Sequence, residues 1–330
     1  MAEMLQFEFM QRALLAALLV GVVAPMVGIF IVQRGLSMIG DALGHVALAG
    51  VGIGLVMHTQ PVWSALVVAV AAALLIETLR ARGGTGSDVV IALMLHAGIA
   101  LGVVLLSTSP AAGGAGLENY LFGAITTTTR ADLVTFAVLG LVVVAATTLL
   151  RPRLFAVAQD EEYSRSQGLP VTALNMLLSA LVAVTIVMSM RVVGLLLISA
   201  LMVVPNAAAQ RLTRGFAAAW WCAIAIGAVS AVGGVTLSYS HDLPSGGTIV
   251  LVTVAIYAAV IVATEVMHRV RIGRHRRATT NEHHEHEHHP DCGHTPVPHG
   301  DHVDYLHGDH LHHPHAGHYD ERPLDAEEAR

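Results

Sequence analysis

Lysine is absent from this chain of 330 residues, and charged and aromatic side chains are scarce. Charged residues make up 13% of the sequence, about half of the share that is typical of soluble proteins. Aromatic residues make up 5%, and the apolar remainder forms long runs of Ala, Val, Leu, Ile and Gly. Because about 20 consecutive apolar residues can cross a bilayer as a helix, this composition excludes an ordinary soluble protein and predicts a polytopic membrane protein.

The missing lysine also excludes one class of enzyme. All 18 basic residues are arginine, whereas a phosphate-binding P-loop requires the lysine of its Gly-x-x-x-x-Gly-Lys-Ser/Thr sequence. The chain is therefore not a P-loop ATPase by itself, and we predict that it is not an enzyme. The two cysteines, Cys222 in an apolar run and Cys292 near the C-terminus, do not indicate a disulfide framework.

Hydropathy predicts an all-α membrane domain with eight or nine transmembrane helices. The two counts differ at residues 193–209, a segment that is short for a crossing. The predicted spans are residues 12–33, 38–57, 62–80, 88–107, 132–150, 171–190, 193–209, 216–238 and 248–267.

Arginine placement predicts the orientation of these spans, because cytoplasmic loops collect positive charge. Arg34, Arg80 and Arg151 belong to every second loop, whereas most of the alternate loops carry no arginine. Arg130 and Arg191 are the exceptions. This alternation favours nine crossings, with the N-terminus outside and the C-terminus in the cytoplasm.

The composition changes abruptly near the C-terminus, where residues 281–318 contain 14 of the 20 histidines. We therefore divide the chain into a transmembrane domain, residues 1–270, and a His-rich cytoplasmic tail, residues 271–330. Few large apolar residues occur in the tail, which predicts that it is disordered. Clustered imidazoles bind zinc and similar ions, although the tail could also be a passive extension. The candidate tail ligands are His283, His284, His286, His288, His289, Cys292 and His294.

Asp41 and His45 form a candidate metal-binding pair inside an otherwise apolar span. Residues at i and i+4 share one face of a helix, and ionisable groups within a membrane usually face a cavity or a partner. A carboxylate and an imidazole suit a divalent first-row cation, zinc among them. Two ligands make a poor site, but two copies of the chain around a twofold axis would supply four. The alternative is structural, with Asp41 capping a helix and His45 bonding to a carbonyl.

The longest polar stretch between two spans is residues 159–170. Its acidic start and its Gly-Leu-Pro end predict one short helix. Such a helix could dock on a cytoplasmic partner, or it could be a solvated connector. The candidate partner-binding residues are Asp160, Glu161, Glu162, Tyr163, Arg165 and Gly168.

The sequence of residues 33–51, QRGLSMIGDALGHVALAGV, resembles the RR-x-SLLGDALSHAALPGV signature of the zinc, manganese and iron ABC-type importer permeases, in particular those of the ZnuB type. Further similar segments follow in the family's order at residues 120–123, 160–168, 191–205 and 238–250. The likeness extends over about residues 10–270.

This resemblance implies a homodimeric permease of the type II ABC importer fold in the bacterial inner membrane. It implies a separate cytoplasmic ATPase as a partner, and an extracytoplasmic metal-binding protein that delivers the ion. It also implies that Asp41 and His45 are ligands in the ion pathway and that residues 160–168 are the coupling helix that contacts the ATPase. The chain departs from the family pattern at Gly44, where Ser is usual, and at Ala49, where Pro is usual; Tyr163 and Ser164 also replace small residues.

We therefore predict the permease subunit of an ATP-driven divalent metal importer with zinc as its cargo, since a His-rich tail suits a borderline-soft ion. Manganese or iron, which are carried by members of the same family, are alternative cargoes, and no permanently bound cofactor is expected. A secondary zinc carrier that works without an ATPase is the alternative from another class of protein.

Overall fold

The computed structural model describes residues 6–82, 86–108, 121, 123, 128–195, 197–279, 292–299, 302–307, 310–315 and 318–323. The chain divides into two compact units, Met1–Ile261 and Val262–Arg330. The last membrane helix, α12 (Ser245–Thr279), continues through the boundary that the sequence suggested at residue 270. That boundary therefore remains a prediction.

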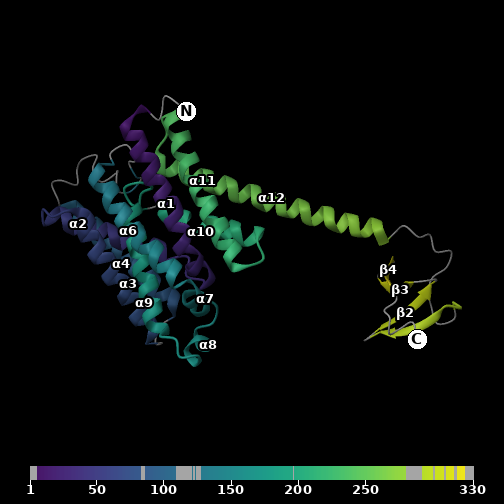
Figure 1. Ribbon diagram of the computed structural model, residues 1–330. Coiled ribbons are helices and arrows are strands. Elements are labelled where there is room, and N and C mark those ends of the chain that lie inside the picture. Colours follow the sequence, from purple (N-terminus) through teal and green to yellow (C-terminus); the bar gives the residue numbers. More distant parts are fainter. Residues whose placement is uncertain are drawn as a thin grey trace. The chain divides into compact units, whose positions relative to one another are not determined.

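The first unit is a bundle of α-helices (Figure 1). Eight helices among the described residues are long and apolar enough to cross a membrane, which confirms the all-α membrane fold. These helices are α1 (Glu8–Gln33), α2 (Ile39–Val56), α3 (Pro61–Ala81), α4 (Ser87–Thr108), α6 (Arg130–Leu149), α9 (Val171–Ser189), α11 (Phe216–His241) and α12. The shorter helices are α7 (Arg151–Gln159), α8 (Glu161–Ser166) and α10 (Ile198–Leu212).

The predicted span at residues 193–209 is an irregular segment followed by α10. The 15 residues of α10 extend about 22 Å at 1.5 Å per residue, which is less than the roughly 30 Å of a hydrocarbon core. Before this helix, Arg191 pairs with Asp132 at the first turn of α6. After it, the ring of Phe216 lies 5.6 Å from that of Phe30, near the last turn of α1. The segment thus connects the two ends of the bundle without one continuous helix.

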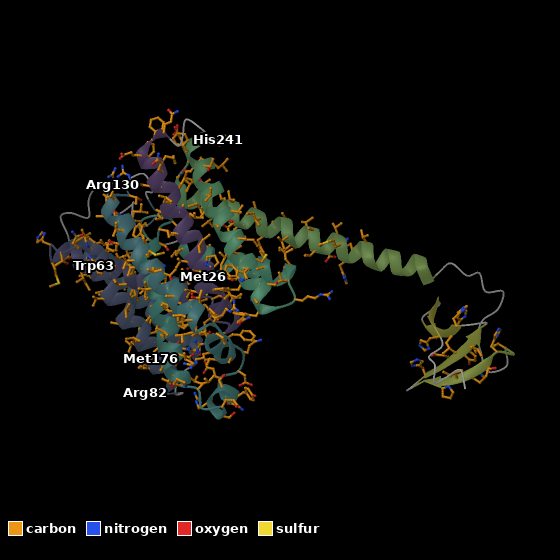
Figure 2. All side chains as sticks on the ribbon, viewed as in Figure 1. Met26, Trp63, Arg82, Arg130, Met176 and His241 are labelled. Atoms are coloured by element: carbon orange, nitrogen blue, oxygen red, sulfur yellow. The ribbon has the colours of Figure 1, made fainter. Side chains whose placement is uncertain are left out.

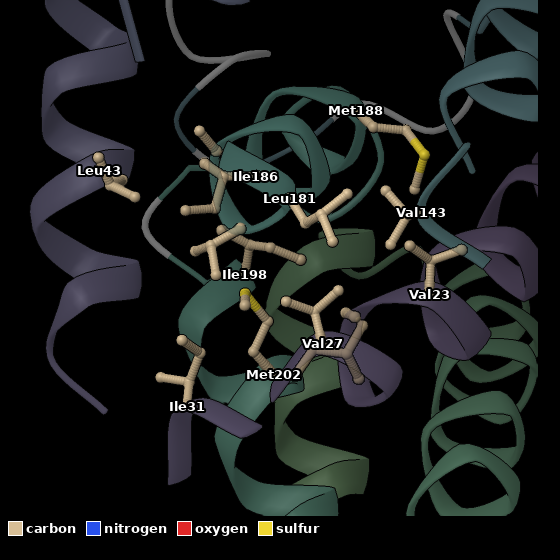
Figure 3. Close-up of a cluster of buried hydrophobic side chains, with 14 of the residues drawn as sticks. Val23, Val27, Ile31, Leu43, Val143, Leu181, Ile186, Met188, Ile198 and Met202 are labelled. Atoms are coloured by element: carbon tan, nitrogen blue, oxygen red, sulfur yellow. The ribbon is translucent and has the colours of Figure 1, made fainter. Parts of the chain in front are cut away.

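The helices pack closely because small residues lie where they cross. A Cβ atom added at Gly227 of α11 would lie 2.3 Å from the carbonyl oxygen of Gly21 in α1. One added at Gly50 of α2 would lie 2.6 Å from Cα of Ala65 in α3. Small residues allow membrane helices to approach and gain dispersion contacts, since lipid provides no hydrophobic drive between them. Larger apolar side chains from α1, α2, α6, α9 and α10 fill the centre (Figure 3).

Replacing Gly28 by Ala is expected to destabilise the bundle, because the new Cβ would lie 1.9 Å from the Met202 carbonyl oxygen of α10. Overpacking of this kind costs about 1–3 kcal/mol. Thermal melting of the purified protein in detergent checks this prediction. The control is Gly233→Ala, whose Cβ would meet its nearest atom at 4.0 Å and whose melting temperature should match that of the wild type. Equal melting temperatures for both variants would contradict the packing of α1 against α10.

The charged residues divide between the two ends of the bundle. Figure 2 shows Arg82 and Met176 at one end and Arg130 and His241 at the other. The two arginines that break the positive-charge pattern both lie at the second end, and each has an acidic partner. Arg130 pairs with Glu8 at 3.1 Å, and Arg191 pairs with Asp132. The carboxylates of Glu8 and Asp132 thus offset the charges of Arg130 and Arg191, the two arginines that do not fit the positive-inside pattern of the loops.

In the tail, the described residues between 295 and 323 form a four-stranded antiparallel sheet, whereas the composition predicts disorder. Its strands are β1 (Thr295–His299), β2 (His302–His307), β3 (His310–His315) and β4 (His318–Pro323), in that order across the sheet. Leu311 is fully buried and Tyr305 is 7% exposed, so a few apolar side chains are enough for a small core. Composition alone hid this sheet, because histidine occupies many strand positions.

Candidate functional site

Asp41 and His45 lie on α2, Asp41 in the first turn and His45 one turn later. Both side chains are half-buried, whereas Ala42, Leu43 and Gly44 between them are buried. Their i, i+4 spacing places them on one side of the helix, and the Asp41 charge acts on the His45 ring. The structure therefore brings together the pair that the spacing suggested and leaves it accessible from one side.

The surroundings of the pair include non-helical backbone. A Cβ atom added at Gly44 would lie 3.1 Å from the carbonyl oxygen of Leu195, in the irregular segment before α10. On another side of α2, Gly98 of α4 packs against the backbone of His45 and Val46. Irregular backbone at membrane depth occurs where it is buried in protein or lines a water-filled cavity, and broken helices commonly form the ion sites of transporters. The absence of a side chain at Gly44 lets the Leu195 carbonyl approach α2 next to His45 in the sequence.

One chain does not complete a metal site at this position. Among the described residues, no group of three or more His, Cys, Asp or Glu side chains close enough to share an ion includes Asp41 or His45. His96, the other histidine within the apolar spans of α2 to α4, is exposed and bonds to the carbonyl oxygen of Ala92 at 2.7 Å. The pair thus offers two ligands, one carboxylate and one imidazole.

The predicted helix in the loop between the fifth and sixth predicted spans is confirmed as α8. Asp160 caps its N-terminus, and its side chain accepts a hydrogen bond from the backbone N–H of Tyr163 at 2.8 Å. The helix ends at Gly168, which has φ +79°, a conformation that glycine adopts without strain. Tyr163 is 63% exposed, and Glu162 and Arg165 are also exposed. The outer face of α8 is therefore exposed at these side chains and accessible to a partner.

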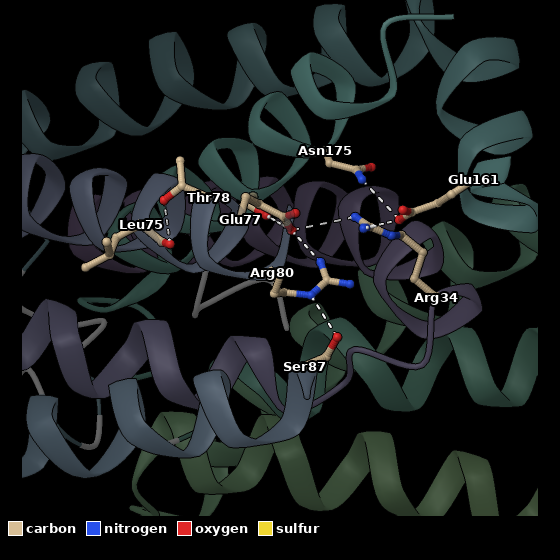
Figure 4. Close-up of polar contacts among 9 residues, drawn as sticks. Arg34, Leu75, Glu77, Thr78, Arg80, Ser87, Glu161 and Asn175 are labelled. Carbon is tan, nitrogen blue, oxygen red and sulfur yellow. Dashed lines mark hydrogen bonds and ion pairs between the residues drawn. The ribbon is translucent and has the colours of Figure 1, made fainter. Parts of the chain in front are cut away.

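Glu161, by contrast, faces the bundle and belongs to a buried polar network (Figure 4). Its Oε1 accepts hydrogen bonds from Arg34 at 2.7 Å and from the Asn175 side chain at 3.0 Å. Arg34 follows α1 and precedes α2, so this network links α8 to the segment that leads into the helix of Asp41 and His45.

Glu77 of α3 forms the second half of the network. Its Oε1 accepts hydrogen bonds from Arg80 at 2.8 Å and from the Ser179 hydroxyl of α9 at 2.9 Å. The same oxygen lies 3.9 Å from a nitrogen of Arg34. The i, i+3 spacing of Glu77 and Arg80 allows a pair within one helix, whereas Arg34 and Ser179 join Glu77 only through the fold.

The Arg34 side chain is only 3% exposed. Burial lowers the pKa of its guanidinium from the usual value, while the carboxylates of Glu77 and Glu161 act in the opposite direction. An arginine remains charged under these conditions. Arg34 is thus a buried cation between one carboxylate on α3 and another on α8, with a hydrogen bond to the second.

The candidate ligands in the tail are mostly beyond the part of the chain that the structure describes. His283, His284, His286, His288 and His289 lie outside the described residues, and the half-buried Cys292 and His294 precede β1.

Instead, the structure brings together His302, Asp304 and His313, whose ligand atoms lie within 4.8 Å of one another. Sequence reasoning missed these three. A repeated sequence could have indicated the sheet. His-Gly-Asp-His occurs at 299–302 and at 307–310, and His-Ala-Gly-His occurs at 315–318. Gly-containing connections of this length are typical of short hairpins.

A helical bundle with an Asp/His pair inside an apolar span, a broken helix beside it and a short, exposed helix at one end is typical of the membrane subunit of a transporter. The comparisons identify which kind. Residues 6–264 match the ABC 3 transport family, and the chain belongs to that family.

Relatives of known name agree with this assignment. The chain is 32% identical to a probable metal transport system membrane protein of Treponema pallidum, over 80% of this chain and 98% of that protein. It is 31% identical to the manganese transport system membrane protein MntC of Halalkalibacterium halodurans, over 78% of this chain and 87% of that protein. A solved structure of PsaBC from Streptococcus pneumoniae in complex with Fab is similar, with a TM-score of 0.71 and 28% identity over 78% of this chain and 94% of that chain.

The protein is thus the permease of an ABC-type divalent metal importer, and the hydrolysis of ATP belongs to another subunit. Membership of an ABC complex implies an ATPase and a binding protein as partners. This family assignment replaces the alternative of a carrier that needs no ATPase. The matched region ends at residue 264, so the His-rich tail lies outside the family model.

Proposed function

We propose that the protein passes Zn²⁺ between two copies of itself, through a site to which each copy contributes Asp41 and His45. The observation that carries this proposal is a half-buried carboxylate and imidazole on one face of α2, where the described residues supply two ligands and no third. Zinc prefers four ligands from nitrogen, sulfur and oxygen. A twofold axis beside α2 would supply two of each kind, because an isologous interface repeats the same residues.

The transported ion must be held in place of its water and then released, which requires a site of moderate strength. Two carboxylates and two imidazoles offset the charge of a divalent ion without the thiolates that hold structural zinc for long times. The Leu195 carbonyl near Gly44 adds a neutral oxygen beside the path. These features support binding that is reversible.

Zinc is favoured over manganese by the imidazole at position 45 and by the 14 histidines of residues 281–318, since imidazole ligands suit zinc better than manganese. The name of the relative from Halalkalibacterium halodurans favours manganese. In vesicles that contain the permease with its ATPase, we expect zinc to inhibit the uptake of radioactive manganese. The zinc concentration required should be at least about tenfold below the manganese concentration that inhibits zinc uptake to the same extent. Stronger competition by manganese or iron would assign the cargo to that metal and leave the transport role unchanged.

We also propose the orientation of the chain. Arg82 lies at the end of the bundle that carries α8 (Figures 1 and 2). Arg34 bonds to Glu161 of α8, Arg80 bonds to Glu77 beside Arg34, and Arg151 begins α7, which precedes α8. The positive-inside rule assigns this end to the cytoplasm. The docking helix then faces the ATPase, and the far end of the bundle faces the protein that delivers the ion. Because the irregular segment and α10 connect the two ends once more, the C-terminal tail is cytoplasmic.

ATP-driven movement of α8 can reach the ion site through Arg34. This residue bonds to Glu161 of α8 and directly precedes the turn into α2. The Arg34 guanidinium also lies 3.9 Å from the Glu77 carboxylate. A small shift of α8 would therefore let Arg34 strengthen its contact with either Glu77 or Glu161. Buried charge pairs with two possible partners provide the discrete arrangements that a conformational switch requires.

A further inference from the structure

We propose that His302, Asp304 and His313 form a second metal site, in the sheet of the tail, that binds a divalent transition metal and suits zinc best. This inference does not depend on which ion the membrane domain transports. It concerns a part of the chain outside the family match, and none of these three residues belongs to the run of histidines at 283–289.

The strand geometry explains why these three side chains meet. His302 and Asp304 are two residues apart on β2, and alternate residues of a strand face the same side. Leu306 pairs with Leu311 across β2 and β3, so His313, two residues beyond Leu311, shares that face with Asp304. Cross-strand neighbours of this kind have Cβ atoms about 4.5–5.5 Å apart, which brings their side-chain ends within reach of one ion.

The distances fit a small tetrahedral site. Asp304 Oδ1 lies 3.5 Å from His302 Nε2 and 3.2 Å from His313 Nδ1. Metal–ligand bonds of 2.0–2.1 Å at tetrahedral angles separate two ligand atoms by about 3.3 Å. The rings of His302 and His313 lie 4.0 Å apart between centroids and are tilted by 50°, so both imidazoles converge on the same carboxylate.

Burial gives the carboxylate a reason to bind a cation. The Asp304 side chain is 1% exposed, and its partner across β1 is Val297. Leu311, on the same face, is fully buried. Buried charges are commonly paired or coordinate metals, and a divalent ion would be shared by this carboxylate and the two imidazoles beside it. Two histidines and one carboxylate are an established ligand set for zinc, with a fourth position left for water.

The test measures zinc held by the full-length protein in detergent, after equilibration with a chelator that removes weakly bound ions from exposed histidines. The wild type is expected to retain one zinc ion per chain. Replacement of His313 by Ala or of Asp304 by Asn should weaken this binding at least about tenfold, as loss of a ligand requires. His310→Ala, which changes the same strand on its opposite face, should retain the ion, and so should a variant with alanine at all five histidines of residues 283–289.

Retention of the ion by both His313→Ala and Asp304→Asn would overturn the site, as would its loss from the variant of residues 283–289. X-ray absorption of the wild-type protein with one equivalent of zinc avoids any effect of substitution on folding. We expect nitrogen and oxygen neighbours at about 2.0–2.1 Å; a sulfur neighbour at about 2.3 Å would place the ion on Cys292 instead and contradict the proposal.

Discussion

Replacement of Asp41 or His45 by Ala is expected to abolish metal uptake in vesicles that contain the permease and its ATPase. Each substitution removes one of the two ligands that a chain provides, and in a dimer it removes two of the four at once. Loss of a partner that only orients a ligand already costs about 10- to 100-fold in metal affinity, so loss of the ligand itself should reduce uptake by more than this. Both side chains are half-buried, so truncation leaves the packed face of α2 unchanged.

Two matched substitutions on α4 control for the removal of a charge or a ring. His96→Ala removes another intramembrane histidine, which is exposed and bonded to its own helix. Asp88→Ala removes an exposed carboxylate from the first turn of a helix. Both should retain wild-type uptake. Co-purification of each variant with the ATPase shows whether the complex assembles, and normal uptake by an assembled Asp41→Ala or His45→Ala complex would refute the assignment.

Replacement of Arg34 by Met is the second change with a large expected effect. It removes the buried cation that contacts both Glu161 of α8 and Glu77 of α3, and with it the polar link between these two helices. Glu77 keeps Arg80 and Ser179, and Glu161 keeps Asn175, so the helices should still fold. We expect uptake to fall at least about tenfold while the ATPase remains bound, with more ATP hydrolysed per ion transported.

A control variant distinguishes the specific effect of losing Arg34 from a general effect of losing a positive charge. Arg269→Met breaks an exposed pair with Glu265, in which the side chains are 77% and 55% exposed. Such pairs contribute about 0–1 kcal/mol, and this variant should transport normally. Glu161→Gln should reproduce the Arg34 defect, and the double variant should be no worse than either single one, as expected for residues in one interaction. Wild-type coupling between ATP hydrolysis and uptake in Arg34→Met would exclude Arg34 as the link.

The candidate ion site could be predicted from sequence because its signal is local. Asp41 and His45 are four residues apart in an apolar run, and α8 lies between Asp160 and Gly168, which mark its ends. The partners of Glu77 could not be found in this way. Ser179 lies 102 residues away along the chain, and no spacing rule connects side chains that meet only after three helices have packed.

Two other elements show where composition misled. The segment at residues 193–209 is apolar enough for a span, but it contains Gly194 with φ +92° and a helix of only 15 residues, so hydropathy could not reveal the break. In the tail, the abundance of histidine hid two signs of a sheet. These are the alternation of residues along each strand and the repeated short sequences that join the strands. Histidine side chains there act as the polar residues of a sheet, and one of them, His312, is fully buried.

The most direct test of the account is the position of the ion in the assembled transporter. Anomalous X-ray diffraction at the absorption edge of the transported metal locates it without relying on any substitution. The account predicts one peak per pair of permeases within the membrane domain, on the twofold axis, with Asp41 and His45 of both copies as its ligands. A peak elsewhere in the membrane domain, or these four side chains directed toward lipid, would contradict it.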